Sequence, residues 1–407
     1  MRVRAWLIFI LCALHLFISQ LYRATNAVLA PWLISDLSLD TQDLGLLSAG
    51  FFYAFSVSQI PIGIFLDKIG AKRIMIALSF VGMAGALMFS LAQGLAVGLA
   101  GRLLIGVGMA CNLMGPLKLM TEWFTPKVFA TLSGLLFAIG TLGNMVSATP
   151  LVLMAERFGW RLSFQAVIAF HLLITLALFW VVRDRPDDRP SRADSPGGSP
   201  REDSLFGRLG TLMGSRDYWI ISAGTFVRYG THAALQTLWA GPLLMEVLGF
   251  SSFQAGNILI LLNFGLIIGG PLWGVVSDRL KTPKWIIAGG LLLLALITFV
   301  LRELPPGTSQ LTAGAVFLAF GIVSASGMHV YAHVKSLFPK EMAGAAMSGT
   351  NFFTMMGPAV FLQGLGIAMQ MIYPEASRGP DAFGTALMIC VLSQAVIGGL
   401  YLFTRSR

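Results

Sequence analysis

Charged residues are scarce in this chain, and that scarcity indicates its class. Asp, Glu, Lys and Arg make up only 12% of its 407 residues, whereas 56% are hydrophobic and the mean hydropathy is +0.76. A soluble globular protein has about 25% charged residues. Because a water-soluble fold of this length cannot bury so much apolar surface, we expect an all-α membrane protein whose solvent is the lipid bilayer.

Cysteines and catalytic motifs are scarce as well. Cys12, Cys111 and Cys390 lie in apolar segments without the spacing of metal ligands, so we expect buried thiols, no disulfide framework and no metal site. The sequence has no phosphate-binding Gly-Lys-[Ser/Thr] loop, so no ATP hydrolysis is expected. It also shows no nucleophile–base pair and no metal-ligand cluster, so we expect no enzyme activity and no cofactor. The net charge of +9 is spread over short loops and forms no basic face, which argues against a nucleic-acid partner.

Apolar segments follow one another along the chain, each close to the length of about 20 residues with which a helix crosses a bilayer. The first segment continues well beyond the apolar region of a signal peptide, so it is interpreted as a helix. The twelve predicted spans are 5–31, 43–66, 74–94, 97–123, 128–154, 161–182, 217–245, 252–277, 285–302, 309–337, 342–372 and 382–403.

A polar segment over 184–216 separates the first six spans from the last six. Its Pro, Gly, Ser and charged residues cannot bury enough apolar surface to fold alone, so it is predicted to be a flexible cytoplasmic linker. The chain would then have an N-terminal six-helix bundle over 1–183 and a C-terminal one over 217–407. Nineteen loop Lys and Arg residues lie on one side and five, Arg102 among them, on the other. This bias predicts an inner-membrane protein with both termini in the cytoplasm.

The two predicted halves repeat a motif, Gly-x-x-x-Asp-[Lys/Arg], at the end of their second span. With twelve spans and a central linker, this motif resembles the major facilitator superfamily over essentially the whole chain. The resemblance implies two pseudo-symmetric six-helix bundles that rock about a site near the midplane, and a motif that acts on the inner gate without touching substrate. Arg102, followed by Gly106 and Gly108, also fits that superfamily. The predicted gating residues are Gly63, Asp67, Lys68, Lys72, Arg73, Arg102, Gly274, Asp278 and Arg279.

Two arginines stand alone inside predicted spans, Arg23 in the first and Arg228 in the seventh. A charge within the bilayer is costly and is retained where it faces a protein interior or a water-filled path. A guanidinium stays charged at any working pH, and its bidentate donors match phosphate or carboxylate. The pair resembles the arginines with which organophosphate:phosphate antiporters clamp a substrate phosphate. The string from Lys118 to Phe124 resembles organic anion transporters of the anion:cation symporter type.

Further polar residues lie on the same helix faces or in span ten. His232 and Gln236 follow Arg228 at the spacing of one helix face. His329 and His333 could form a proton relay or be hydrogen-bonded core histidines. The predicted binding residues beside the arginine pair are Tyr22, Asn26, His232, Gln236, His329 and His333. Lys118 and Lys335, near the cytoplasmic ends of their spans, either pair with surface acids or attract anions into a vestibule.

Acidic residues are missing from the middle of every predicted span. A symporter usually carries its coupling charge on such a carboxylate, so the absence favours exchange or facilitated transport. We therefore predict a secondary transporter of a small organic anion, a carboxylate or a phosphate ester, that works by alternating access. The alternatives are a proton-coupled symporter that uses histidine, a transporter-like ligand sensor, and a drug or metabolite exporter. The expected partners of this carrier, taken to be a monomer, are the small anion and the bilayer.

Overall fold

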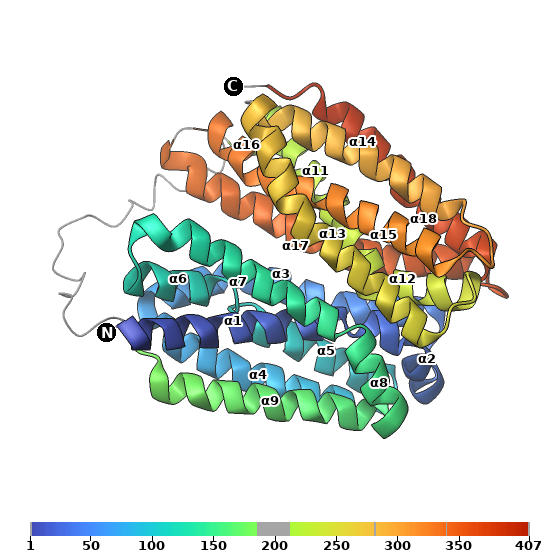
Figure 1. Cartoon of the computed structure of the whole chain (residues 1–407), viewed down its shortest axis with the longest axis horizontal. Coiled ribbons are helices and arrows are strands. Elements are labelled where there is room, and N and C mark those ends of the chain that lie inside the picture. The colour runs from blue at the N-terminus through green and yellow to red at the C-terminus, as the bar shows by residue number, and fades with distance from the viewer. Residues whose placement is uncertain (1, 185–211, 281, 339, 406–407) are drawn as a thin grey trace.

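The computed structural model of the protein describes residues 2–184, 212–280, 282–338 and 340–405. Within these ranges the regular elements are all helices, and they form two bundles that lie one above the other in Figure 1. Blue to green helices make up the first half and yellow to red helices the second. Most of the predicted linker, over 185–211, lies outside the described residues.

The first half forms six spans, of which the first, fourth and fifth are each built from two helices. The helices are α1 (Arg2–Ala24), α2 (Asn26–Leu37), α3 (Thr41–Ile69), α4 (Ala71–Ser90), α5 (Leu95–Met109), α6 (Met114–Trp123), α7 (Pro126–Val146), α8 (Thr149–Phe158) and α9 (Trp160–Val181).

The second half also forms six spans, and its first and fourth are interrupted. Span seven is α11 (Arg216–Ala234), the π-helix η2 (Leu235–Trp239), α12 (Ala240–Pro242) and the π-helix η3 (Leu243–Val247). Span ten is α15 (Gln310–Ser324), the 3₁₀-helix η4 (Ala325–His329) and α16 (Val330–Leu337). The remaining spans are α13 (Ser252–Leu280), α14 (Pro283–Arg302), α17 (Lys340–Ile372) and α18 (Pro380–Tyr401).

Ten helices among the described residues are long and apolar enough to cross a membrane. The α3 helix and the stretch from α11 to η3, which the sequence predicts as spans two and seven, are not among them. The α11 helix is less apolar because it carries Arg228 and His232. Polar groups on a spanning helix are expected where it lines the interior of the bundle.

The interruptions of four spans lie next to a proline downstream. Pro116, Pro150 and Pro242 each follow a break or a π-helical turn within a few residues, and Pro31 lies in α2 just after the break at Thr25. Proline has no N–H to donate to the preceding turn, so a carbonyl one turn earlier loses its partner and the helix departs from α geometry. Spans one, four, five and seven are therefore interrupted at these positions.

The halves meet towards the end of the bundle that carries α2, α8 and α12, called the distal end here; the opposite end, near the N-terminus, is called the terminal end (Figure 1). Hydrogen bonds between the halves join Thr41 to Ser377 at 2.7 Å, Tyr53 to Gln363 at 2.7 Å and Thr149 to Asn257 at 2.8 Å. The longest packed interface between the halves is that of α3 with α17.

Backbone contact between the halves is closest at Gly241. A Cβ atom at this position would lie 1.6 Å from the carbonyl oxygen of Ala27, so only glycine allows α12 to touch α2. The distal end is therefore closed by backbone against backbone.

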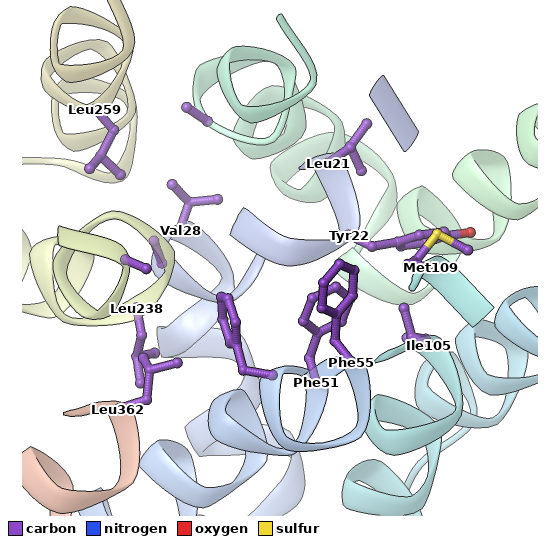
Figure 2. Close-up of a cluster of buried hydrophobic side chains, with 14 of the residues drawn as sticks. Leu21, Tyr22, Val28, Phe51, Phe55, Ile105, Met109, Leu238, Leu259 and Leu362 are labelled. Atoms are coloured by element: carbon purple, nitrogen blue, oxygen red, sulfur yellow. The ribbon is translucent and has the colours of Figure 1, made fainter. Parts of the chain in front are cut away.

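The buried core crosses both halves. Figure 2 shows Tyr22, Phe51 and Phe55 of the first half close to one another, with Leu238 and Leu362 of the second half beyond them. Phe51 and Phe55 stack at 5.8 Å between ring centroids with an interplanar angle of 22°. Since these side chains are almost completely buried, packed aromatic and aliphatic side chains fill this part of the interior.

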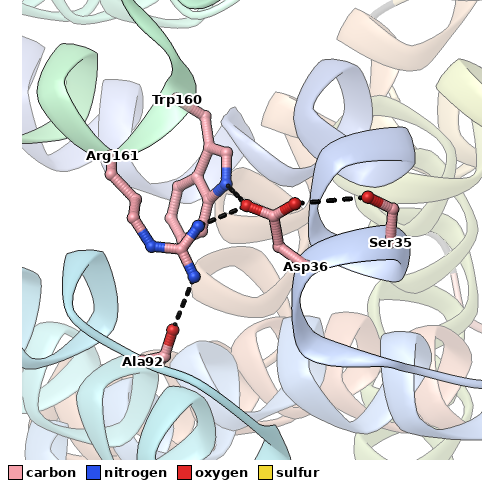
Figure 3. A network of polar contacts seen from close by, with 5 residues as sticks. All are labelled: Ser35, Asp36, Ala92, Trp160 and Arg161. Carbon is pink, nitrogen blue, oxygen red and sulfur yellow. Dashed lines mark hydrogen bonds and ion pairs between the residues drawn. The ribbon is translucent and has the colours of Figure 1, made fainter.

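A polar network fixes α2 to the rest of the first half at the distal end (Figure 3). Asp36 accepts a hydrogen bond from the indole of Trp160 at 2.9 Å and pairs with Arg161, and Arg161 also donates to the carbonyl of Ala92 at 2.8 Å. The Trp160 N–H and, next, Arg161 and Ser35 hold the pKa of the Asp36 carboxyl below its usual range against a partial opposing effect of burial. These contacts join α2 to α9 and to the loop after α4.

Candidate functional site

Arg23 lies at the end of α1 and reaches across to the second half. Its guanidinium donates to the hydroxyl of Tyr229 on α11 at 2.7 Å, and the side chain is 7% exposed. The rings of Phe51, Phe52 and Phe55 surround it, with centroids 5.8, 5.5 and 5.2 Å from its Cζ. Cation–π contacts contribute about 0.5 to 2 kcal/mol each. Arg23 is thus a buried cation whose hydrogen-bond partner among the described residues is a neutral phenol from the other half.

Arg228 lies one residue before Tyr229 but turns into its own half. It donates from Nη1 to the carbonyl of Ser324 at 2.7 Å, where span ten changes from α15 to the 3₁₀ turn. A Cβ atom on Gly327 would lie 1.6 Å from the Cζ of Arg228, so the missing side chain of Gly327 provides the space for the guanidinium. Arg23 and Arg228 therefore lie on either side of the α11 backbone near the middle of the bundle.

His232 joins the same group of residues. Its Nδ1 lies 3.0 Å from the hydroxyl of Ser324, and its ring stacks on Phe320 at 5.7 Å and on Tyr229 at 6.2 Å. The result is a continuous set of contacts from Arg23 through Tyr229 and His232 to Ser324. Because Ser324 also accepts from Arg228, the two predicted arginines share this network.

Two of the remaining predicted residues of spans one and seven are buried and hydrogen-bonded within their own halves. Asn26 donates to Ser48 at 2.8 Å, and Gln236 donates to Asn263 at 2.8 Å. Tyr22 points into the first half, where its ring lies 5.9 Å from that of His171, and no partner is found for its hydroxyl among the described residues.

The hydrogen bonds of the two histidines of span ten among the described residues involve neither arginine of the pair. His333 lies 2.8 Å from the hydroxyl of Tyr401 and 3.1 Å from the carbonyl of Arg405, both at the terminal end. His329 contacts the carbonyl of Ser326 at 3.1 Å and is partly exposed. These contacts favour a structural role for His333. His329 is nearer in sequence to Gly327, the residue that packs against Arg228.

Arg102 requires a correction, because the loop count treats it as a residue on the outer side. The structure buries it completely inside α5, between the rings of Phe51 and Phe89 at 5.4 and 5.7 Å. Its Nη1 donates to the carbonyl of Tyr22 at 2.8 Å. The break at Thr25 exposes that carbonyl at the negative end of α1, so a cation is well placed there. Arg102 stabilises the joint of span one and does not lie in a loop.

The predicted gating motif lies at the terminal end. Lys68, Arg73 and Arg279 are exposed there, and Gly274 has open space where a side chain would be. The backbone N–H of Lys72 donates to Asp184 at 2.8 Å, so the start of the linker caps α4. The side chains of Asp67, Asp278 and Lys335, and the surroundings of Gly63, lie outside the described part of the structure.

Lys118 donates to the carbonyl of Leu66, near the end of α3. It thereby ties span four to the end of the helix that carries the motif. This contact leaves both predicted roles of Lys118, the surface pair and the anion vestibule, as predictions. Among the described residues, no group of His, Cys, Asp and Glu comes together that could hold a metal ion.

Several residues of the site escape sequence reasoning. Tyr229 follows Arg228 directly, and neighbouring positions on a helix face different directions, so the helix-face pattern leaves it out. Phe51, Phe52 and Phe55 resemble any lipid-facing aromatic run in the sequence. Their i, i+4 spacing at 51 and 55 is a signal that they share a face. The acceptor at Ser324 is a backbone carbonyl, which no side-chain pattern can reveal.

Comparison with known proteins decides the family. A model described as "Major Facilitator Superfamily" matches residues 11–362. The chain belongs to the Major Facilitator Superfamily. It is therefore a multi-pass membrane transporter and not an enzyme.

Curated relatives within the superfamily are named for organic anions. The chain is 25% identical over 333 residues to a probable sulfoacetate transporter of Cupriavidus necator, covering 77% of this chain and 74% of the relative. It is 28% identical over 272 residues to a hexuronate transporter of Bacillus subtilis, covering 64% of this chain and 61% of the relative. It is 26% identical over 385 residues to a probable galactarate/D-glucarate transporter of Bacillus subtilis, covering 86% and 82%. The match to the hexuronate transporter spans less than two-thirds of that relative.

Solved structures of superfamily members have the same fold. A bacterial homologue of the human lysosomal transporter Spinster, described as inward-facing and unoccupied, matches with a TM-score of 0.80 at 17% identity, over 99% of this chain and 97% of that one. The D-xylose–proton symporter matches with a TM-score of 0.78 at 14% identity, over 98% and 97%. These likenesses show the major facilitator fold of two pseudo-symmetric bundles.

Proposed function

We propose that this transporter carries a small organic anion across the cytoplasmic membrane by alternating access, and that Arg23 and Arg228 bind the anion between the halves. The observation that carries the proposal is the pair of buried guanidinium groups beside the α11 backbone. Among the described residues, their hydrogen-bond partners are a phenol and a carbonyl oxygen, not carboxylates. A buried cation without an opposite charge is costly, so the site favours an anion. The names of the relatives, sulfoacetate, hexuronate and galactarate/D-glucarate, support the same class.

The orientation and the state of the carrier are part of this proposal. With both termini in the cytoplasm, the distal end faces outward, and its closure by Gly241 and by the hydrogen bonds between the halves corresponds to an inward-facing carrier. The likeness to a Spinster homologue described as inward-facing supports this assignment. Binding at a midplane site followed by rocking of the halves is the usual mechanism of such folds.

Exchange is the proposed mode of coupling. Two cations and a bound dianion are close to neutral, whereas an empty site would carry two uncompensated charges during reorientation. Proton symport is the alternative within the same site, with His232 as the histidine nearest to the arginines. A transporter-like sensor would bind the same anion without moving it.

The test uses purified protein in liposomes and a panel of sulfoacetate, a hexuronate, tartrate and glycerol 3-phosphate. We expect Arg23→Lys and Arg228→Lys each to lower uptake at least tenfold, because lysine keeps the charge but loses the bidentate donors. Arg157→Lys, an exposed arginine on α8, is the matched control and should transport normally. Thermal unfolding shows whether each variant is folded. Normal uptake by either folded pair variant would remove that arginine from the site, and binding without uptake in the unmodified protein would favour a sensor.

A further inference from the structure

We propose that Tyr229 is the place-holder of the empty anion site. By this we mean that its hydroxyl accepts a hydrogen bond from Arg23 when no anion is bound, and that the anion must displace the hydroxyl to bind. This inference rests on the proposed function but concerns a residue that lies outside the arginine pair. Tyr229 belongs to the second half and Arg23 to the first, and their hydrogen bond is 2.7 Å long. Because the phenol is neutral, this bond does not neutralise the charge of Arg23, but it gives one N–H of the guanidinium an acceptor and links the halves.

Loss of this hydrogen-bond partner would be energetically unfavourable for Arg23. The guanidinium is 7% exposed, three phenylalanine rings surround it, and its Nε has no partner among the described residues. A buried donor without an acceptor costs about 1 to 3 kcal/mol, and more when the donor is charged. The hydroxyl of Tyr229 offers one acceptor to this cation. An anion offers several acceptors and a full negative charge, so it competes with the phenol for the same N–H groups.

Tyr229 is held in position by aromatic contacts, and among the described residues its hydroxyl makes no hydrogen bond besides that with Arg23. Its ring stacks on His232 at 6.2 Å with an interplanar angle of 26°, and His232 stacks in turn on Phe320 at 5.7 Å with an angle of 10°. His232 also contacts the hydroxyl of Ser324, whose carbonyl accepts from Arg228. Release of the phenol from Arg23 would therefore change the contacts of His232 and Ser324, and Ser324 is the residue that holds Arg228. The positions of the two arginine side chains are therefore coupled through this stack.

The place-holder has two consequences that can be separated. It makes the anion compete with an internal ligand, which lowers the apparent affinity for the anion. It also holds the empty carrier in the conformation seen here, because the bond joins α1 to α11. Loss of the hydroxyl should therefore raise affinity and shift the conformational equilibrium, whereas a residue that simply binds the substrate would lower affinity when truncated.

The first arm of the test needs no anion. Spin labels on Val128→Cys and Trp285→Cys, exposed positions at the terminal ends of α7 and α14, report the distance between the halves. We expect Tyr229→Phe to shift the distance distribution of the empty protein towards closure of the terminal end. Tyr373→Phe is the control, because its hydroxyl bonds to Thr385 at 3.0 Å within the second half. An unchanged distribution in Tyr229→Phe would overturn the proposed link between the halves.

The second arm measures affinity by calorimetry, with the member of the panel that the unmodified protein transports. We expect Tyr229→Phe to bind about tenfold more tightly, which corresponds to about 1.4 kcal/mol. Tyr53→Phe is the matched control, because it removes a hydrogen bond of 2.7 Å between the halves that involves no arginine. Weaker binding by Tyr229→Phe would overturn the place-holder and make Tyr229 a ligand of the anion. If the unmodified protein binds no member of the panel, the proposed function fails, whereas the distance measurement still decides whether Tyr229 links the halves.

Discussion

Arg23, Arg102 and Arg228 lie deep in the molecule, and they are stabilised in two ways. Arg23 has a phenol from the opposite half, whereas Arg102 and Arg228 each donate to a main-chain carbonyl that a helix interruption leaves available. The ring of Phe51 lies within 6 Å of two of these guanidinium groups, at 5.8 Å from Arg23 and 5.4 Å from Arg102. At this scale the site depends on neutral acceptors and aromatic faces and not on ion pairs.

Two buried histidines give a contrast that can be measured. Both ring nitrogens of His171 lack a partner among the described residues, whereas those of His333 contact Tyr401 and the carbonyl of Arg405. We expect His333→Phe to cost about 1 to 3 kcal/mol of stability, because the tyrosine hydroxyl and the carbonyl lose their partner. His171→Phe should cost much less. Thermal unfolding in detergent tests the order, and a larger loss for His171→Phe would contradict it.

At the scale of elements, the interrupted spans are the main departure from the sequence-based prediction. The sequence predicts spans one, four, five, seven and ten as continuous helices, and in the structure each contains a break, a π-helix or a 3₁₀ turn. Hydrophobic periodicity reports length and burial, and it continues through a break such as Thr25. The prolines downstream, such as Pro242, are the signal that could have indicated these interruptions in spans one, four, five and seven, whereas span ten has no proline near its 3₁₀ turn.

The contact of α2 with α12 yields a prediction about the distal end. Gly241→Ala would place a Cβ atom against the carbonyl of Ala27, so the two helices must separate. We expect this variant to lose the distally closed state and to transport poorly. Labels on Leu153→Cys in α8 and Phe253→Cys in α13 should show a longer distance than in the unmodified protein.

The control is Gly289→Ala on α14, where nothing lies within 4 Å of an added Cβ. It should leave both the distance and transport unchanged. A Gly241→Ala protein with the normal distal distance would mean that α2 and α12 are not in backbone contact in the membrane.

The network at the end of α2 predicts a dependence on pH. Trp160 and Arg161 stabilise the ionised Asp36, so its pKa is lower in the folded state than in the unfolded state. A carboxyl with a lowered pKa adds stability above its unfolded value of about 3.9, and that stability is lost as the pH falls through the folded value. We therefore expect the melting temperature to fall more steeply below about pH 4 in the unmodified protein than in Asp36→Asn. Parallel curves would show that the network does not contribute.

At the scale of the whole molecule, the fold could be predicted further than the site. Low charge, twelve apolar segments and the repeated motif around Asp67 predict the major facilitator fold, and the family match confirms it. The positions of Arg23 and Arg228 in the sequence indicate buried cations. Their partners could not be predicted, because Tyr229 comes from the other half and the acceptor at Ser324 is main chain. Contacts of that kind exist only once the halves are packed.

Exchange is the prediction that concerns the whole transport cycle. Reorientation of the empty site would move two cations without a counter-charge, at a cost of several kcal/mol. We expect preloading of liposomes with substrate or phosphate to stimulate uptake more than an imposed pH gradient does. Strong stimulation by inward-directed protons without an internal anion would instead favour symport, with a histidine such as His232 or the substrate itself as the proton carrier.

Arg23 and Arg228, which have no carboxylate partner among the described residues, also make the transport cycle sensitive to the membrane potential. A full transmembrane potential of 100 mV acts on one elementary charge with about 2.3 kcal/mol, and an empty site with two positive charges experiences the fraction of this field that it crosses. A potential that is negative inside would then draw the empty site towards the cytoplasm and retain it there. With a dianion bound the site has almost no net charge, so the loaded step would respond little to voltage.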